Sequence, residues 1–175
     1  MLKLFAFNLY HETIFDINLQ ALFDAGIRLI LTDLDNTLVG SDAKAPTEAV
    51  IDWFEKVKTM GFTIKIVSNN FNPERVRTFA QNLGIEAYDN AKKPLKFKIL
   101  KWLRPFKREE VVFIGDQLLT DIVVGNRLRV YTILVKPINL SADEDITKIN
   151  RRIERRIAKR LYARGLPVPP HINID

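Results

Sequence analysis

The sequence predicts an α/β fold in which a mainly parallel sheet is covered by helices on both faces. Short apolar runs alternate along the chain with longer amphipathic stretches, which is the order expected of successive β-α-β units. The 175 residues suit one domain with a sizeable core, and a hydrophobic content of 47% is typical of a globular protein. We therefore expect a single domain over residues 1–175, with a catalytic body over 1–140 and a helix and tail over 141–175.

Strands and helices alternate in the predicted order. The expected strands are the apolar runs 28–32 (RLILT), 63–67 (TIKIV), 111–114 (VVFI) and 130–135 (VYTILV). Pro46 is expected to open a helix that ends near Gly61, and Pro73 to open one that ends before Gly84. A third helix is expected from Pro94 through Leu103, and a short one after Thr120. Because ligands of such sheets bind beyond the carboxyl ends of the strands, we expect functional residues there.

A basic amphipathic helix is expected near the C-terminus. Ser141 and Glu144 form a capping-box pattern, and Gly165 with Pro167 marks the helix end. One side carries Ile146, Ile149, Ile153, Ile157 and Leu161, and the other carries Arg151, Arg152, Arg155, Arg156 and Lys159. Three interpretations fit this pattern: the isoleucines pack on the domain, residues 146–164 lie on an anionic membrane, or the cations bind RNA.

The N-terminal region is rich in large apolar side chains, namely Leu4, Phe5, Phe7, Leu9, Tyr10, Ile14 and Phe15. Either this segment covers the sheet or its aromatic edge dips into lipid. No apolar run reaches the roughly eighteen residues of a spanning helix. A signal peptide is not expected either, which favours the cytoplasm.

Charge and residue inventory restrict the chemistry. The net charge is +6, and residues 148–164 alone contain eight basic residues and one acidic residue, so the basic character is assigned to this segment. The chain has no cysteine, which excludes thiolate enzymes and cysteine zinc sites. The two histidines lie near the two ends of the chain, so catalysis would depend on carboxylates.

Carboxylates and a hydroxyl follow the first two expected strands. Asp33 and Asp35 come directly after the first, where one can attack an electrophile while the other transfers a proton, and both can help hold a hard cation. Taken alone, this pair fits a loop or a metal–sugar-nucleotide site equally well. Ser68 ends the second strand and fits either a phosphate donor or a helix cap.

Two further signals follow along the chain. Lys92 and Lys93 precede Pro94, where a lysine would offset phosphate charge or remain a solvated surface residue. Asp116 and Asp121 follow the third strand and fit either oxygen ligands or the start of a capped helix.

In this order, the motifs DLDNT (33–37), Ser68, Lys93 before Pro94 and GDQLLTD (115–121) resemble those of the haloacid dehalogenase (HAD) superfamily of phosphatases. The resemblance implies a three-layer α/β/α, Rossmann-like fold. It also implies an aspartyl-phosphate formed on Asp33, with Asp35 as the acid/base, Ser68 as a donor to the phosphoryl group and Lys93 as the residue that orients the nucleophile.

The same resemblance implies a metal site and substrate contacts. Mg²⁺ would be bound by Asp33, Asp116 and the backbone carbonyl of Asp35, with Asp121 supporting these ligands. The implied substrate-binding residues are Asn36, Thr37, Asn69 and Lys93. Lys93 is preferred to Lys92 as the motif lysine because it directly precedes Pro94.

The spacing of the motifs leaves no room for a cap domain. Thirty-four residues separate Asp33 from Ser68 and 24 separate Ser68 from Lys93, enough in each case for one helix and one strand. An uncovered cleft suits a phosphate carried by a protein, a nucleic-acid end or a lipid at a membrane surface.

The runs DLDNTLV, SNN, AKKP, GDQLLTDI and TILVKP are similar to the YqeG-type branch of capless HAD phosphatases, which is related to phosphatidylglycerophosphatases. This resemblance implies removal of the terminal phosphate from phosphatidylglycerophosphate at the inner face of the cell membrane, without a nucleic-acid partner. Two alternatives stay open: a capless phosphatase acting on a protein or nucleic acid, and a partner-binding scaffold without turnover.

Overall fold

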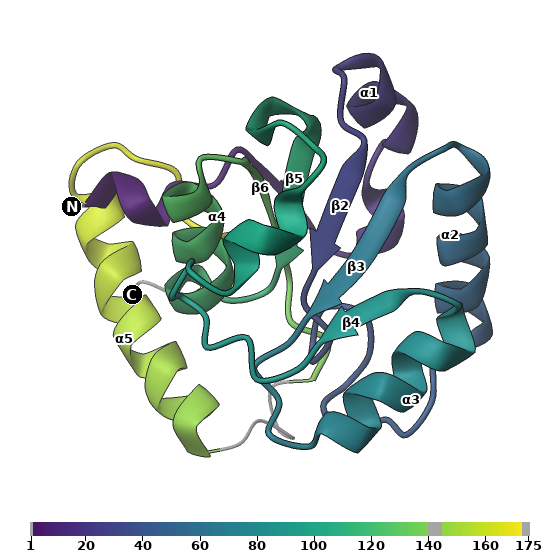
Figure 1. Cartoon of the computed structure of the whole chain (residues 1–175). Helices are drawn as coiled ribbons and strands as arrows, with labels where there is room; N and C mark the ends of the chain where they lie inside the picture. Colours follow the sequence, from purple (N-terminus) through teal and green to yellow (C-terminus); the bar gives the residue numbers. More distant parts are fainter. Residues whose placement is uncertain (1, 140–144, 173–175) are drawn as a thin grey trace.

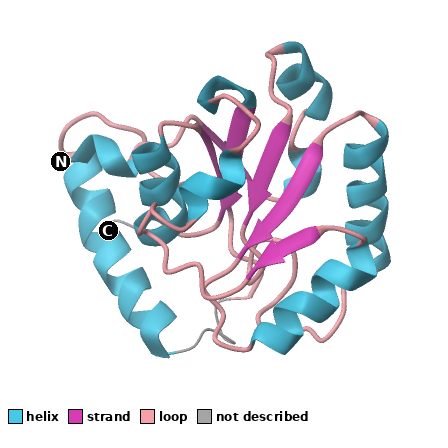
Figure 2. Cartoon of the chain, in the orientation of Figure 1, coloured by secondary structure: helices cyan, strands magenta, loops and turns pink. Residues whose placement is uncertain are grey.

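The computed structural model describes residues 2–139 and 145–172 and has three layers, α/β/α (Figures 1 and 2). Within these residues, six strands form one sheet in the order β1-β6-β5-β2-β3-β4, and all neighbouring strands are parallel. The strands are β1 (Leu9–His11), β2 (Leu29–Thr32), β3 (Thr63–Val67), β4 (Glu86–Tyr88), β5 (Val111–Gly115) and β6 (Tyr131–Val135). The predicted parallel sheet between helical layers is confirmed.

Helices cover both faces of this sheet. They are α1 (Leu19–Asp24), α2 (Glu48–Thr59), α3 (Pro73–Leu83), α4 (Val123–Leu128) and α5 (Asp145–Tyr162). Shorter turns are η1 (Leu2–Phe5), η2 (Ile14–Asp16), η3 (Ile99–Leu103), η4 (Arg108–Glu110) and the π-helical turn η5 (Leu118–Ile122). In the described part of the chain, no helix combines the length and the apolarity needed to cross a bilayer.

The central strands β2 and β5 are apolar except for Thr32 at the end of β2, because both strands are buried on both faces. One face of the sheet packs against α1, α2 and α3, through side chains that include Ile30, Ile66, Phe54 and Phe79. The other face packs against η3 and α4, through side chains that include Leu31, Phe113, Ile99 and Val124. Successive strand residues therefore fill two separate cores, and polar residues are left to the strand ends.

The predicted helix over 94–103 is wrong in its first half. Residues 94–98 form turns, and only η3 is helical, as a 3₁₀ segment. Leu95 and Phe97 are exposed, so the apolar residues that suggested a helical face are divided between solvent and core. Ile99 and Leu103 are the buried pair, which is enough to dock a single short turn.

The N-terminal segment covers the sheet and also extends it. Residues 9–11 form the edge strand β1 beside β6, an element that the sequence pattern did not predict. Phe5, Phe7 and Tyr10 pack on the small core of Leu118, Ile122 and Leu134. Covering the sheet is therefore the correct interpretation for these three aromatic residues.

Helix α5 packs on the domain through a different side from the one expected. Ile157 and Leu161 are buried, but Ile149 and Ile153 are 54% and 39% exposed, so the interpretation of the isoleucines as the packed stripe is wrong for the first half of the helix. Arg151 and Glu154 face the domain instead, because a buried carboxylate lies there. The helix end is as predicted: Gly165 is left-handed, and Leu166 N donates to Leu161 O. The Ser141–Glu144 pattern lies outside the described residues.

Candidate active site

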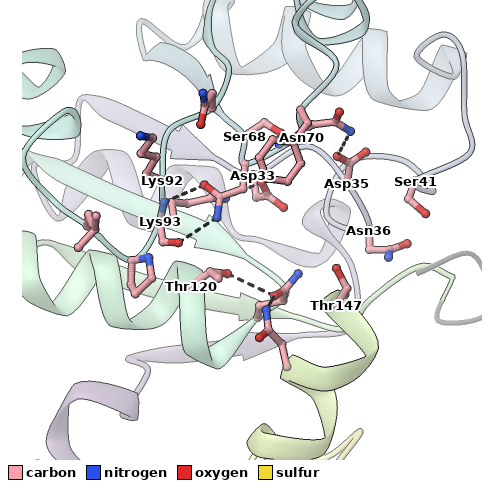
Figure 3. A pocket seen from close by; sticks show the side chains of 17 residues that line it. Asp33, Asp35, Asn36, Ser41, Ser68, Asn70, Lys92, Lys93, Thr120 and Thr147 are labelled. Carbon is pink, nitrogen blue, oxygen red and sulfur yellow. Dashed lines mark hydrogen bonds and ion pairs between the residues drawn. The ribbon is translucent and has the colours of Figure 1, made fainter. Parts of the chain in front are cut away.

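The sequence-predicted site residues meet at the carboxyl edge of the sheet. Asp33 follows β2, Ser68 follows β3 and Asp116 follows β5, and these three strands are adjacent. They surround a cavity of about 530 Å³ that is lined by Asp33, Asp35, Ser68 and Lys93, among others (Figure 3). Thr147 and Asn150 of α5 line the same cavity, so the C-terminal helix contributes to its wall.

Three buried carboxylates form the centre of the site. One oxygen each of Asp33, Asp116 and Asp121 lies within 4.8 Å of the others, and all three residues are buried. Asp121 reaches this position because Gly115 has no side chain: a Cβ on Gly115 would lie 2.3 Å from the Asp121 Cγ. The glycine before Asp116 is therefore required by close packing of its own motif.

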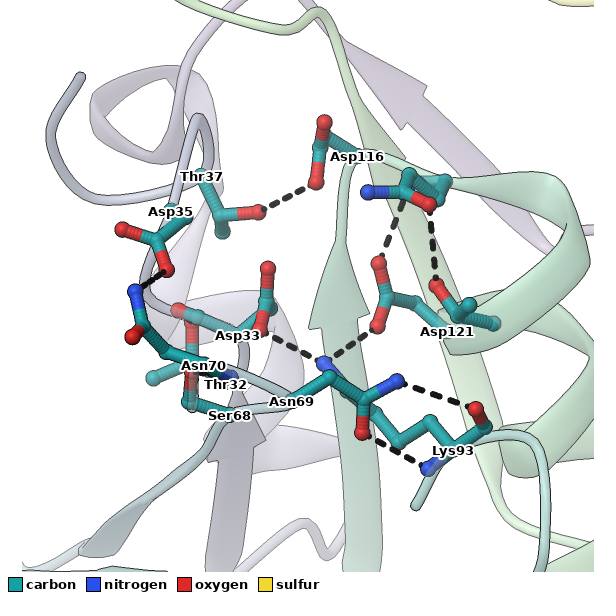
Figure 4. A network of polar contacts seen from close by, with 12 residues as sticks. Thr32, Asp33, Asp35, Thr37, Ser68, Asn69, Asn70, Lys93, Asp116 and Asp121 are labelled. Atoms are coloured by element: carbon teal, nitrogen blue, oxygen red, sulfur yellow. Dashed lines mark hydrogen bonds and ion pairs between the residues drawn. The ribbon is translucent and has the colours of Figure 1, made fainter. Parts of the chain in front are cut away.

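Lys93 lies between two of these carboxylates. Its Nζ is 2.6 Å from Asp33 Oδ1 and 2.7 Å from Asp121 Oδ1, and its side chain is 2% exposed (Figure 4). Asn69 fixes the lysine backbone, since its Oδ1 accepts from Lys93 N and its Nδ2 donates to Lys93 O. Lys92 is exposed and lines the outer cavity. The buried ammonium is thus that of Lys93.

The electrostatics of the cluster favour binding of a cation. Burial raises the pKa of Asp33 well above its usual range; Lys93 opposes this effect, whereas Asp121 and Asp116 add to it. Burial also raises the pKa of Asp116 to about 6, although Arg151 opposes the shift. Burial alone would lower the pKa of Lys93, but Asp121 and Asp33 outweigh it and raise the pKa, so the ammonium stays charged.

The donor set fits a hard divalent cation. Asp33, Asp116 and Asp121 offer only carboxylate oxygens, the ligand type that Mg²⁺ and similar ions prefer. Lys93 and Arg151 supply two positive charges against these three carboxylates. A cation bound here would supply the missing charge and would attract a phosphate oxygen.

Asp35 points into the cavity but is held apart from the cluster. Arg75 Nη1 is 2.6 Å from Asp35 Oδ1, and Asn70 Nδ2 donates to Asp35 Oδ2 over 2.8 Å. Arg75 also donates to the backbone carbonyls of Ala43 and Gly40, so α3 ties down the loop that follows β2. Sequence reasoning missed Arg75, because no local pattern marks a helix arginine as the partner of a distant carboxylate.

The remaining sequence-predicted residues are all near the cluster. Thr37 Oγ1 donates to Asp116 Oδ1 over 3.2 Å, which links the first and last motifs. Ser68 is fully buried and its Oγ accepts from Asn70 N. Asn36 lines the cavity, and its Oδ1 accepts from Asn139 N.

Helix α5 contributes two residues that sequence reasoning did not assign to the site. Arg151 forms an ion pair with the Asp116 carboxylate and donates to Asp116 O, and it also pairs with Glu154. Glu154 accepts from Leu119 N, and burial raises its pKa to about 7 despite Arg151. Glu154 is the one acidic residue among the eight basic residues of 148–164, and this was the sequence feature that could have marked it as a partner of Arg151.

Comparison with known sequences gives three matches. The sequence model of the family described as "Mitochondrial PGP phosphatase" matches residues 3–139. The probable phosphatase YqeG of Bacillus subtilis (strain 168) is 42% identical over 165 residues, which cover 93% of this chain and 95% of that protein. Phosphatidylglycerophosphate phosphatase 1, chloroplastic/mitochondrial, of Arabidopsis thaliana is 25% identical over 165 residues, covering 89% of this chain and 47% of that protein. The chain therefore spans about half the length of the plant relative.

Several solved structures share the fold, among them one from Xanthomonas campestris and one from Haemophilus influenzae. A hypothetical protein from Xanthomonas campestris superposes with a TM-score of 0.53 at 17% identity, covering 79% of each chain. The cobalt-bound deoxy-D-mannose-octulosonate 8-phosphate phosphatase (YrbI) of Haemophilus influenzae superposes with a TM-score of 0.50 at 16% identity, covering 81% of this chain and 91% of that chain. At these identities the likeness shows the fold alone.

Proposed function

This chain belongs to the mitochondrial PGP phosphatase family and is a phosphatase of the HAD type, and from that premise we propose that it dephosphorylates phosphatidylglycerophosphate to phosphatidylglycerol. One observation carries the proposal. The Asp33 carboxylate lies at the floor of the cavity, 2.6 Å from a buried ammonium and beside two further carboxylates. This arrangement combines a nucleophile with the means to neutralise phosphate charge.

In the proposed reaction, an Asp33 oxygen attacks the phosphorus in line and forms an aspartyl-phosphate while the P–O bond to the lipid alcohol breaks. Asp35 gives its proton to the departing oxygen and then takes a proton from the water that hydrolyses the intermediate. Lys93 holds Asp33 in position and balances its charge. Arg75 and Asn70 fix the carboxyl group of Asp35 for both proton transfers.

Further residues bind the phosphoryl group and the ion. Ser68 would donate to a phosphoryl oxygen, and Asn36, Thr37 and Asn69 would position the substrate or the loops around it. Asp33, Asp116 and the backbone carbonyl of Asp35 would bind Mg²⁺, supported by Asp121, and the ion would withdraw charge from the phosphoryl group. Asn69 acts through Lys93, since both ends of its amide contact the Lys93 backbone.

A lipid substrate is supported by the activity for which the plant relative is named and by the absence of an inserted cap domain between the described motif residues. The residues between Asp33 and Ser68 form α2 and β3, and those between Ser68 and Lys93 form α3 and β4. Both segments are part of the three-layer body, so the cavity stays accessible to a large phosphomonoester. A protein or nucleic-acid phosphate is the alternative substrate.

We further propose that the protein is cytoplasmic and associates peripherally with the inner face of the cell membrane through residues 146–164. The outer side of α5 carries Arg152, Arg155, Arg156 and Lys159, which are exposed together with Ile149 and Ile153. Cations and apolar side chains on one exposed helix side are typical of interfacial helices.

The test is phosphate release with Mg²⁺, comparing phosphatidylglycerophosphate in mixed micelles with a panel of soluble phosphomonoesters. Asp33→Asn should abolish turnover of the lipid, whereas Asp52→Asn, at an exposed carboxylate on the outer side of α2, should retain it. Turnover of soluble esters alone would refute the lipid assignment and leave the phosphatase chemistry intact. Equal activity of Asp33→Asn and the unmodified protein would refute Asp33 as the nucleophile.

A further inference from the structure

The chain has a second basic segment outside residues 148–164, although the net charge of that part of the chain is close to zero. Residues 92–108 contain eight lysines and arginines and no acidic residue. Residues 92–108 therefore carry a net charge of +8 and residues 148–164 a net charge of +7, so the chain outside these two segments has a net charge of −9. The interpretation that basic character belongs only to the C-terminal segment is therefore wrong, because opposite charges elsewhere cancel in the sum.

The first part of this segment borders the catalytic cavity. The loop 92–98 leads away from Lys93, whose ammonium is buried in the carboxylate cluster. The other lysines of the loop point outward: Lys92 and Lys98 are exposed and Lys96 is partly exposed. Arg127 donates to Pro94 O over 2.9 Å, which ties the loop to α4.

Large apolar side chains are exposed at the same place. Phe97 is 77% exposed and Leu95 is 52% exposed, and Phe71, on the neighbouring loop between β3 and α3, is 73% exposed. Phe97 and Phe71 are the two most exposed large hydrophobic residues in the described part of the chain. Phe71 and Leu95 themselves line the cavity. Exposed apolar side chains of this size, gathered at one opening, indicate a contact surface.

We propose that this rim, formed by Phe71, Leu95, Phe97, Lys92, Lys96 and Lys98, inserts into the headgroup region of an anionic bilayer, so that the catalytic cavity opens directly onto the membrane. Aromatic and aliphatic side chains enter the interface while lysines contact anionic headgroups. Residues 92–108, which supply five of the six rim residues, contain no acidic residue that would repel those headgroups.

The rim is a different surface from the outer side of α5. Membrane contact through the rim would orient the protein so that its catalytic cavity faces the bilayer. It rests on the proposed function only for the identity of the substrate, since binding to a bilayer can be measured without turnover. A cavity that faces the bilayer would receive the phosphorylated headgroup while the acyl chains stay in the lipid. The product could then return to the membrane without crossing water.

The experiment is flotation of the full chain with vesicles of phosphatidylcholine alone or with phosphatidylglycerol added. Phe97→Ser should lower partitioning onto anionic vesicles about tenfold, as expected when a phenyl ring no longer enters the interface. Lys96→Gln with Lys98→Gln should lower it about fivefold per lysine, on the anionic vesicles only. Phe97 does not line the cavity, so turnover of a soluble ester such as p-nitrophenyl phosphate should stay at the level of the unmodified protein, which also verifies folding.

Tyr131→Ser is the matched control, because this exposed aromatic residue lies at the amino end of β6, whereas the cavity lies at the carboxyl ends of the strands. It should bind vesicles like the unmodified protein. As a second measurement, Phe97→Trp should retain binding and show a blue shift of tryptophan emission when anionic vesicles are added.

Three results would overturn the rim proposal. Full vesicle binding by Phe97→Ser, with loss of binding in Arg152→Gln/Arg156→Gln, would assign the membrane contact to α5 alone. Absence of vesicle binding by the unmodified protein, with soluble-ester turnover intact, would refute membrane docking and leave the phosphatase assignment standing. Salt-sensitive RNA binding that is lost in Phe97→Ser, without vesicle binding, would assign the rim to nucleic acid.

Vesicle binding that depends on Phe97 in a protein without any turnover would support the rim proposal and refute the proposed function.

Discussion

Two basic segments reach the same carboxylate cluster, and each contributes one inward cation in a different way. Lys93 comes from an irregular loop, is buried, and contacts both Asp33 and Asp121. Arg151 comes from the regular helix α5, is 13% exposed, and contacts Asp116. The loop cation is held by the Asn69 clamp on its backbone, whereas the helix cation is held by Glu154 one turn later. The comparison shows that the charge balance of the site is shared between a catalytic motif and a C-terminal helix.

Removing the loop cation should have the largest effect. Lys93→Met leaves two buried carboxylates without their partner, so we expect activity to fall about a thousandfold. The free energy of unfolding should fall by about 3 kcal/mol. Turnover and denaturant unfolding would measure both effects. Lys92→Met is the control, and a larger loss in that variant would make Lys92 the motif lysine.

Removing the support of the helix cation should have an intermediate effect. Glu154→Ala leaves Leu119 N without its acceptor and removes one of the two carboxylates that pair with Arg151, which should lower the free energy of unfolding by about 2 kcal/mol. Denaturant midpoints would measure the change. Glu55→Ala, which breaks an exposed i,i+3 pair on α2, should change stability little. Equal effects of the two variants would contradict a structural role for Glu154.

Removing Arg151, the helix cation, should raise the affinity of the site for Mg²⁺, whereas removing a metal ligand would lower it. Arg151 repels a divalent cation and occupies Asp116, so Arg151→Met should lower the Mg²⁺ concentration for half-maximal activity about tenfold. A Mg²⁺ titration of turnover would measure this, with the exposed Arg155→Met as control. A requirement for more Mg²⁺ in Arg151→Met would show that Arg151 assists the site rather than competing with the ion.

The charge of Arg151 also affects His171, in addition to Asp116 and Glu154. The smallest expected effect is therefore on the stability of the fold at acidic pH. Burial and, to a smaller extent, the positive charge of Arg151 together lower the pKa of His171 to about 4, and the ring stacks on Tyr10. The unfolded histidine, with a pKa near 6.5, binds the proton more tightly than the folded one, so this group destabilises the fold as pH falls from about 6.5 toward 4. Between pH 7 and pH 5.5 its share is about 1 kcal/mol.

His171→Phe should remove that share, so its denaturant midpoint should change less between these two pH values than that of the unmodified protein. Arg151→Met should weaken the dependence in part, because one source of positive charge near the ring is lost. An unchanged pH dependence in His171→Phe would assign acid sensitivity to other groups.

Much of the site could be predicted from the sequence because its motifs are local. Asp33, Ser68 and Asp116 each follow a run of apolar residues, and the parallel sheet brings those run ends together. Arg75 could not be predicted as the partner of Asp35, since the pair is forty residues apart and joined only by packing of α3. Residues 94–98 were wrongly predicted as helix, because the spacing of apolar residues along the sequence does not show whether each one is buried in the core or exposed at the rim of the cavity.

The sequence by itself determined the strands β2, β3, β5 and β6 with the helices α2 and α3, and it identified Asp33, Lys93 and Asp116 as site candidates, since apolar periodicity and strand-end residues act over a few positions. The tertiary structure decided which side of α5 is buried and which cations face the cluster. Helix periodicity favoured the isoleucines of α5, but the buried Asp116 carboxylate selects Arg151 instead. Leaving the buried Asp116 carboxylate unpaired would cost more folding free energy than leaving an isoleucine exposed. Which side of α5 is buried therefore depends on residues that are distant along the chain.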